Sequence, residues 1–445
     1  MENTVKRRID FENRLLDNGV SRFRHAFAWW KGRKLNKTTL LFLLTIFTVN
    51  LFITYPLFGR DVSASFSSSV FLLLAGILDN AHIMTKSQFF SVLTIFSITF
   101  APISYYLFVR KTAMRHELIA LVATMFYILP NPLTNGGSVL SEAILNGDGA
   151  HVFVFSFLPL FLLYVRAYIS TGVKVWGFIA AIITAVVAVI SPFATFNLLI
   201  IFGVITVSEG FFRDLREKIS RLMFLLISSF LLSFFWYYPN ILGEIVVLEH
   251  VSFAINKIVS ILPLAIPIIP VAGLLLFLVF DRREKLKPVF LAVSFFLIYV
   301  TLYFISSDLN ITGIFTSKRY LLELAFGSSY LLAMIFIVVI ELMIRSYIPR
   351  IKNDVLLFLS ILTCSALIFL FGAFAVVGVI KGQEHLAKQP IVNSYKSGIG
   401  NIGRAFSFKD GLSVVPVGIS VLTFIFLLLY LKLGSASVVK AKEGE

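Results

Sequence analysis

Long apolar runs recur along the whole chain, and short charged clusters separate them. A helix of roughly 20 apolar residues matches the hydrocarbon thickness of a bilayer, whereas a soluble core helix is shorter. The 445 residues are 58% hydrophobic and include 47 Phe, but only 14% are charged. Because a charge at the bilayer centre costs several kcal/mol, the charged clusters mark the loops. The chain is therefore expected to be all-α, a polytopic integral membrane helical bundle.

The apolar runs predict about twelve transmembrane helices within a polytopic domain at 38–432. We expect the spans at 38–58, 88–109, 117–133, 151–170, 174–190, 193–209, 219–239, 261–280, 287–305, 321–345, 354–380 and 413–432. The run from Val70 to Leu78 is too short to cross and is expected to lie along or dip into the outer surface. Residues 1–37 are expected to form a cytoplasmic basic amphipathic segment, and 433–445 a cytoplasmic tail.

The distribution of positive charge predicts the orientation of these spans. With the N-terminus inside, 29 of the 39 Lys and Arg lie in inner segments and 10 in outer ones. Cytoplasmic loops carry such an excess, so both termini are expected in the cytoplasm of a multi-pass protein of the cell membrane.

Several classes of function are disfavoured by what the sequence lacks. The net charge of +15 is spread over many short loops and forms no continuous basic face, so membrane topology explains it and no nucleic-acid partner is expected. The chain has no GxxxxGK[ST] motif and no HExxH motif. Cys364, the single cysteine, lies in an apolar run, which excludes an intrachain disulfide and a cysteine metal site.

The first outer loop carries three candidate catalytic residues, Asp61, Asp79 and His82. If the segment up to His82 is helical, Asp79 and His82 share a face and could pass a proton or hold a divalent metal. Alternatively, Asp79 ends an interfacial helix and His82 faces water.

Two further pairs are candidate substrate-binding residues at the outer side. Asp148 and His151 precede the fourth span; Asp148 could instead be an N-cap that satisfies the free amides of that helix. Lys318 and Arg319 precede the tenth span and could bind a lipid-linked phosphate. Interfacial snorkelling is the alternative explanation for this basic pair.

Four features together resemble polytopic GT-C-type membrane glycosyltransferases of bacteria and archaea. They are Asp61 after the first span, "NGDGAHVFVFSFLPLFLLYVRAYI" at 146–169, "SPFATFNLLIIFGV" at 191–204 and "FFWYYPN" at 234–240. The resemblance covers about residues 38–240. It implies an outer-face transferase that uses a polyprenyl-phosphate sugar, with Asp61 as base or metal ligand and Asp79 as the second candidate for that position.

The sequence leaves other functions open. A non-enzymatic membrane subunit or scaffold, partnered by lipids and other membrane subunits, fits the scarcity of ionisable groups within the spans. A transporter or flippase is a third hypothesis. A divalent metal is an open possibility for cofactor, and the substrate is not specified by any motif.

Overall fold

The computed structural model describes residues 37–57, 60, 65–66, 69–113, 117–129, 138–210, 214–235, 287–308, 317–346, 377, 380 and 414–443. In these residues the secondary structure is helical, without a strand, which confirms the all-α class. The elements are α2 (Lys37–Thr54), η1 (Tyr55–Leu57), α3 (Ser69–Asn80), α4 (Lys86–Thr112), α5 (Glu117–Ile128), α6 (Val139–Leu145), α7 (Gly149–Thr171), α8 (Lys174–Ile190), α9 (Pro192–Gly210), α10 (Leu215–Ser233), α13 (Lys287–Asp308), η5 (Ser317–Tyr320), α14 (Leu321–Ser346) and α17 (Val414–Glu443).

Ten of the twelve predicted spans coincide with one of these helices. Among the described residues, six helical segments are long and apolar enough to cross a membrane: Lys37–Thr54, Lys86–Thr112, Gly149–Thr171, Phe193–Gly210, Pro288–Ser307 and Ser317–Phe336. The predicted spans at 261–280 and 354–380 fall outside the description, apart from residues 377 and 380, and so does the segment 1–36. The count of twelve remains a prediction. The predicted tail boundary at 433 falls within α17.

Local sequence signals explain where several helices begin and end. Thr85 and Gln88 form a capping box at the start of α4. α7 ends at Gly172, whose φ of 71° is a left-handed conformation that glycine adopts without strain. Pro192 occupies the first position of α9, where its missing N–H is not needed, and Ser191 Oγ accepts a hydrogen bond from the N–H of Ala194 at 3.2 Å. Ser191 and Pro192, which separate the predicted spans 174–190 and 193–209, therefore form a helix-to-helix junction.

One end of the bundle gathers the starts of α2, α5, α10 and α13 with the ends of α4, α7 and α9. Glu117 accepts hydrogen bonds there from Thr39 and Arg110, and Glu209 pairs with Arg166. We call it the basic end, because the described basic residues near it include Lys37, Arg110, Lys111, Arg166, Lys174, Arg216, Lys218, Arg221 and Lys287.

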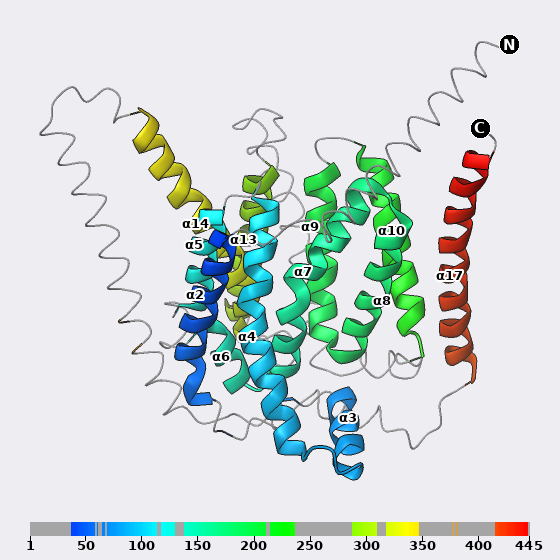
Figure 1. The fold of residues 1–445 in the computed structure, drawn as a ribbon, viewed down its shortest axis with the longest axis horizontal. Coiled ribbons are helices and arrows are strands. Elements are labelled where there is room, and N and C mark those ends of the chain that lie inside the picture. Colours follow the sequence, from blue (N-terminus) through cyan, green and yellow to red (C-terminus); the bar gives the residue numbers. More distant parts are fainter. Residues whose placement is uncertain are drawn as a thin grey trace, which may run out of the picture.

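The opposite end, called here the far end, holds α3, α6 and the starts of α4, α7, α9 and α14. Figure 1 draws it at the bottom, below α7. Its described basic residues are Arg60, Lys86, Lys318 and Arg319. The two ends thus differ in positive charge in the sense that the sequence predicted, although the side of the membrane that each faces remains a prediction.

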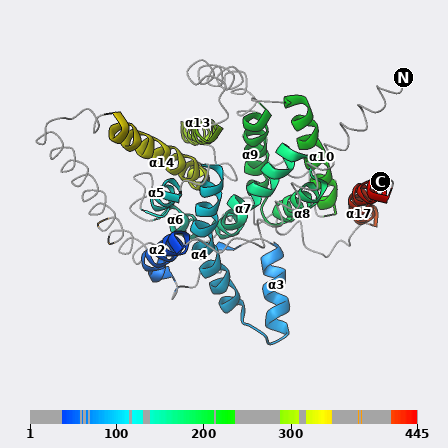
Figure 2. The ribbon, with the colours of Figure 1, turned by 45° about the horizontal axis from the view of Figure 1, so that its top comes forward.

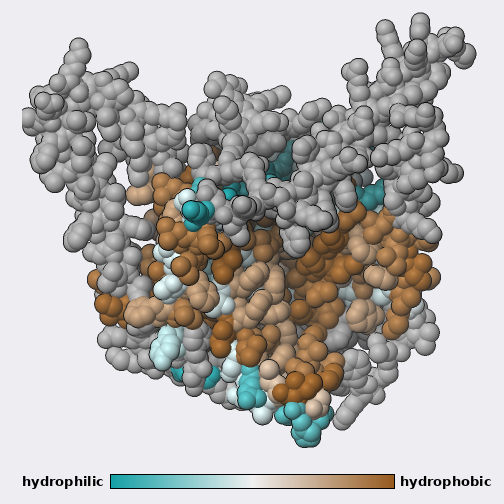
Figure 3. Space-filling model, in the orientation of Figure 1, coloured by the Kyte–Doolittle hydropathy of each residue, from teal (hydrophilic) through white to brown (hydrophobic). Residues whose placement is uncertain are grey.

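α7 is the central helix of the bundle. It packs most extensively on α4 and also contacts α8 and α9, and Figures 1 and 2 both show it between them. Gly177 allows the close approach of α8, since a Cβ there would lie 2.6 Å from the Tyr168 ring. The described outer faces are apolar: Leu40, Leu41 and Leu44 of α2 are each at least 58% exposed, and apolar side chains cover the flank seen in Figure 3. Such faces suit contact with lipid tails.

Candidate functional site

Five polar side chains meet inside the far end, and we call them the polar cluster: Asp148, His151, Asn197, Arg319 and Glu323. They come from the start of α7, from α9, from η5 and from the first turn of α14. As whole residues none is more than 7% exposed, and Glu323 is fully buried. Buried charges are costly unless they are paired, so this arrangement needs a specific reason.

Arg319 and Asp148 form a bidentate ion pair across 171 residues of sequence. Arg319 Nε donates to Asp148 Oδ2 at 2.8 Å, and Arg319 Nη2 donates to Oδ1. The guanidinium also lies over the ring of Phe193, 4.4 Å from its centroid. Two parallel charge-assisted hydrogen bonds and a cation–π contact fix the orientation of this arginine.

The 3₁₀ turn η5 separates the two neighbouring basic residues. Lys318 is exposed on this turn, whereas Arg319 is buried at 5% exposure. A tight turn of about three residues per revolution points adjacent side chains in different directions. One cation is therefore committed to Asp148 inside the bundle, and the other remains available at the surface of the far end.

Glu323 contacts the two remaining members of the cluster, His151 and Asn197. His151 Nε2 lies 2.9 Å from Glu323 Oε1, and Asn197 Nδ2 donates to the same oxygen at 2.5 Å. The histidine and the carboxylate are close, but the two atoms are not aligned as a hydrogen bond. The ring of His151 also packs edge-on against Phe193, with centroids 4.9 Å apart. One carboxylate thus links α7, α9 and α14.

Several polar atoms of the cluster have no hydrogen-bond partner among the described residues. They are Nδ1 and Nε2 of His151, Oδ1 of Asn197 and Oε2 of Glu323. Buried polar atoms are nearly always satisfied by protein, water or a ligand. These three adjacent side chains therefore retain hydrogen-bonding capacity that the described residues do not use.

Three buried tyrosines lie near Glu323. Tyr127, Tyr299 and Tyr320 each lie close enough to interact with its charge. Tyr299 donates a long hydrogen bond of 3.4 Å to the Asn197 carbonyl, and the Tyr127 hydroxyl has no partner in the described part of the chain. These phenols extend the set of groups that could hold a hydroxylated ligand.

The structure brings together three of the four substrate-binding candidates at this end, Asp148, His151 and Arg319. The two alternative explanations hold only in part. Asp148 occupies the N-cap position of α7, but its carboxylate makes no capping hydrogen bond, because both oxygens bind Arg319. Arg319 does not snorkel, because it is buried and paired.

The catalytic candidates of the first outer loop lie elsewhere or outside the described residues. α3 ends at Asn80, and His82 follows it with a φ of 55°, so the expectation of a helical face shared by Asp79 and His82 is wrong. Their contact is a backbone hydrogen bond of 3.0 Å from the His82 N–H to the Asp79 carbonyl. His82 is exposed, and the Asp79 carboxylate is 3.9 Å from Lys86 Nζ. Asp61 is outside the described residues.

Ser65 and Phe66, two described residues that follow Asp61 in the sequence, lie beside the cluster. Ser65 Oγ donates to the Ile144 carbonyl of α6 at 2.6 Å. Phe66 packs on Gly149, the residue after Asp148, so closely that a Cβ there would lie 2.8 Å from its ring. Only glycine fits at this position, because the Cβ of any other residue would displace Phe66.

Asn197 and Glu323 are the members of the cluster that the sequence did not predict as site residues. In the sequence, Glu323 is an acid near the end of a predicted span, and Asn197 is a polar residue within an apolar one. Polar residues inside apolar runs are the signal that could have found both.

The described residues contain no group of three or more His, Cys, Asp or Glu side chains that could hold a metal ion. A divalent metal at Asp61 therefore stays a prediction from the resemblance. No protein-family model matches this chain, and neither a curated protein nor a solved structure shows significant similarity to it. The described residues thus form a helical bundle with membrane-length helices and a buried polar cluster at one end.

Proposed function

We propose that this chain is a multi-pass membrane glycosyltransferase of the GT-C type. It takes a sugar from a polyprenyl-phosphate carrier at the far end of the bundle, which faces outward, while both termini are cytoplasmic. The concentration of described Lys and Arg at the basic end supports this orientation. The apolar outer faces support a bilayer around the bundle.

One observation carries the proposal: the polar cluster is buried, incompletely satisfied and adjacent to Ser65 and Phe66, which follow Asp61 in the sequence. A purely structural polar network is expected to satisfy its own atoms. Sugar hydroxyls both donate and accept hydrogen bonds, so they complement the unpartnered atoms of His151, Asn197 and Glu323. The exposed Lys318 next to this cluster suits the phosphate of the carrier.

The proposed reaction is an inverting displacement at the anomeric carbon. The acceptor oxygen forms a bond to that carbon while Asp61 takes the acceptor's proton. The bond between the anomeric carbon and the phosphate oxygen breaks, and its electron pair leaves with the lipid phosphate. Lys318 stabilises the charge on that leaving group. The Asp148–Arg319 pair positions Lys318 by fixing the η5 turn.

Turnover of a polyprenyl-phosphate sugar by the purified full chain tests the proposal. Asp61→Asn preserves size but removes the base, so product formation should fall by roughly 10²-fold or more, with expression and insertion unchanged. Asp79→Asn tests the second candidate acid of the same loop, and Asp214→Asn at the basic end is the control that should retain full activity. Full activity of Asp61→Asn, once the parent is shown to be active, refutes the assignment of this base.

A non-enzymatic membrane subunit is the second candidate, and a specific observation favours it. Glu323 and Arg319 tie α14 to α7 and α9, which is what a rigid scaffold requires. This candidate predicts no turnover with any polyprenyl-phosphate sugar and a protein partner that co-purifies stoichiometrically in mild detergent. Transport without turnover in sealed vesicles would instead favour a transporter.

A further inference from the structure

α3 and the first turns of α4 form a helical hairpin at the far end. Figure 1 draws both below the ends of the other labelled helices, and residues 81–85 connect them. A helix of 12 residues is about 18 Å long, so α3 cannot cross a hydrocarbon core of about 30 Å. The surroundings of α3 therefore have to be inferred from its surface and from its neighbours.

One face of α3 is attached to the bundle. Phe71 is 3% exposed and Ala75 is fully buried, and residues four apart lie on the same side of a helix. The Phe71 ring packs edge-on against Phe153 of α7, with centroids 5.0 Å apart. Phe153 also contacts Phe96 of α4, which is itself 38% exposed. The start of α3 is thus attached well along α4, and its surface is continuous with the outer face of that helix.

The remaining surface of α3 is apolar and exposed. Leu72, Leu73, Leu74 and Ile77 are 42–54% exposed, and Ile83 in the connection to α4 is 70% exposed. Apolar area in contact with water costs about 25 cal/mol per Å², so a group of leucine and isoleucine side chains is unfavourable there. Contact with acyl chains removes this cost.

α4 indicates where the hydrocarbon begins at this end. Residues 89–109 contain no charged side chain and measure about 31 Å as a helix, which matches the thickness of the hydrocarbon core. Lys86 and Gln88 precede this run and are exposed. The boundary of the hydrocarbon at the far end is therefore expected beside Gln88.

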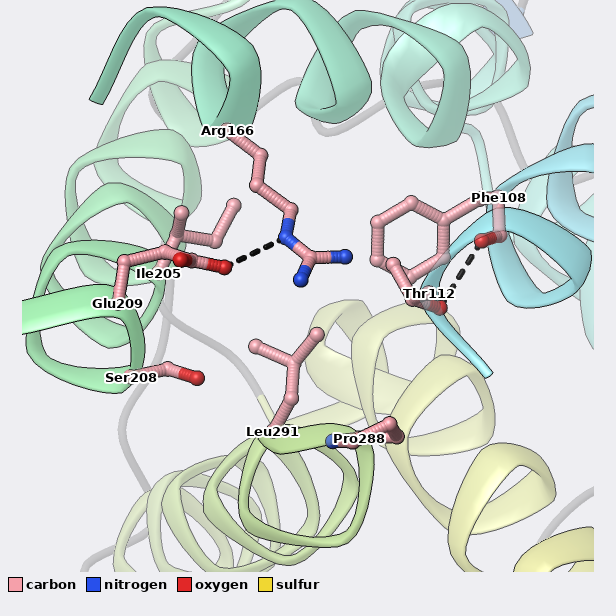
Figure 4. Close-up of a pocket in the computed structure, with 8 residues that line it drawn as sticks. All are labelled: Phe108, Thr112, Arg166, Ile205, Ser208, Glu209, Pro288 and Leu291. Carbon is pink, nitrogen blue, oxygen red and sulfur yellow. Dashed lines mark hydrogen bonds and ion pairs between the residues drawn. The ribbon is translucent and has the colours of Figure 1, made fainter. Parts of the chain in front are cut away.

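The basic end supports the other limit of this run, which is Arg110. Phe108 and Thr112 of α4 line a small recess together with Arg166 and Glu209, and Figure 4 shows the ion pair that these last two residues form. Charged groups of α7 and α9 thus lie at the level where α4 reaches Arg110. Three helices therefore change from apolar to charged at the same level.

The polar end of α3 lies level with the polar start of α4. Asp79 Oδ2 is 3.9 Å from Lys86 Nζ, and Asn80 and His82 beside them are exposed. Figure 3 shows hydrophilic side chains at the lower tip of this hairpin and hydrophobic ones directly above them. The body of α3 is therefore on the hydrocarbon side of the boundary that α4 defines.

We propose that α3 is a half-membrane helix embedded upright in the leaflet at the far end. Its exposed leucine and isoleucine side chains contact acyl chains, and its C-terminal end reaches the headgroups. Of the two arrangements expected from the sequence, lying along the surface or dipping into it, this is the second. The proposal concerns the contact with lipid, and it does not depend on sugar transfer.

Spin-label accessibility tests the proposal on the full chain, with Cys364→Ser, reconstituted into phosphatidylcholine vesicles. Labels at Leu73→Cys, Ile77→Cys and Ile83→Cys are compared for collision with oxygen, which concentrates in hydrocarbon, and with a water-soluble nickel chelate. The ratio of oxygen to nickel accessibility should rise from position 83 to 77 to 73. Four residues of an upright helix differ in depth by about 6 Å, which is enough to separate the labels at 73 and 77.

Two reference positions calibrate the ratio. Leu44→Cys lies on the exposed apolar face of α2 and gives the value for a lipid-facing site, whereas His82→Cys lies at the polar tip and gives the value for water. The ratio at 73 should be several-fold above that at 82 and close to that at 44. All these side chains are exposed, so the substitutions should leave the packing of the bundle unchanged.

Three results would overturn the proposal. High nickel accessibility at 73 and 77 means that α3 is in water. Equal ratios at 73, 77 and 83 mean that the helix lies flat along the surface. Low accessibility to both reagents at 73 and 77 means that a protein, either a partner or a second copy of this chain, covers the apolar face.

Discussion

Separating Asp148 from Arg319 should destabilise the bundle by an amount that the structure allows us to estimate. The two side chains are 8% and 4% exposed, so solvent screens their attraction very little. Removing one partner of a buried pair costs about 3–5 kcal/mol, because the other charge is left buried without compensation. We therefore expect Asp148→Leu and Arg319→Met each to cost about that much, equivalent to a factor of roughly 10² to 10³ or more in the unfolding equilibrium.

The double variant gives the decisive comparison. Asp148→Leu/Arg319→Met replaces both charges with apolar groups, and such replacements are often neutral or stabilising. The measurement is equilibrium unfolding of the full chain in mixed micelles titrated with sodium dodecyl sulfate, followed by tryptophan fluorescence. Lys318→Met, on the exposed neighbour, should change the free energy of unfolding by no more than about 0.5 kcal/mol. If the two single costs simply add in the double variant, the pair is not coupled and the reasoning fails.

Three further predictions concern helix packing, membrane topology and the N-terminal segment. Gly327→Ala should cost about 1–3 kcal/mol, because its Cβ would lie 2.9–3.1 Å from the α13 backbone, whereas Gly203→Ala meets no atom within 4 Å and should be neutral or slightly stabilising in the same titration. With Cys364 replaced, single cysteines at positions 307 and 285 should react with an impermeant thiol reagent from opposite sides of the membrane; labelling from one side would refute the predicted topology. Deletion of residues 2–24 should leave membrane insertion intact by fractionation, and failure to insert would contradict a surface-lying segment.

Most of the helical architecture could be predicted because hydropathy alone determines it. A run such as Lys174–Ile190 is apolar along its length and is bounded by polar or glycine-containing segments, so its helix follows from the sequence. The short helix near Val70 was also predictable from its length. The packing of the helices could not be predicted, because an apolar helix face in lipid does not specify which other helix it contacts. The placement of α7 against α4 depends instead on details such as the Ser104 hydroxyl, which donates to the Ser156 carbonyl.

The candidate site could be predicted only in part. Asp148, His151 and Arg319 stand out because polar residues beside an apolar run are few. Their partners could not be identified, since the ion pair spans 171 residues and the Asn197–Glu323 hydrogen bond spans 126. The Asp148 carboxylate makes no capping hydrogen bond for the same reason, since its partner Arg319 is distant in the sequence. A capping carboxylate gains only about 1 kcal/mol from the helix amides, whereas a buried guanidinium offers two charge-assisted hydrogen bonds.

The role of Arg319 depends on its burial, which the sequence does not show. A basic residue at a helix entrance is indistinguishable in sequence from a snorkelling one, and Lys318 beside it is indeed exposed. Arg319 is only 5% exposed, so its charge must be paired with an anion. Asp148, at the start of α7, is that anion. Glu323 one turn further on then needs donors of its own, which Asn197 supplies and His151 can supply. Each buried charged group thus requires a partner inside the bundle. Some atoms of His151, Asn197 and Glu323 remain without a hydrogen bond from the described residues.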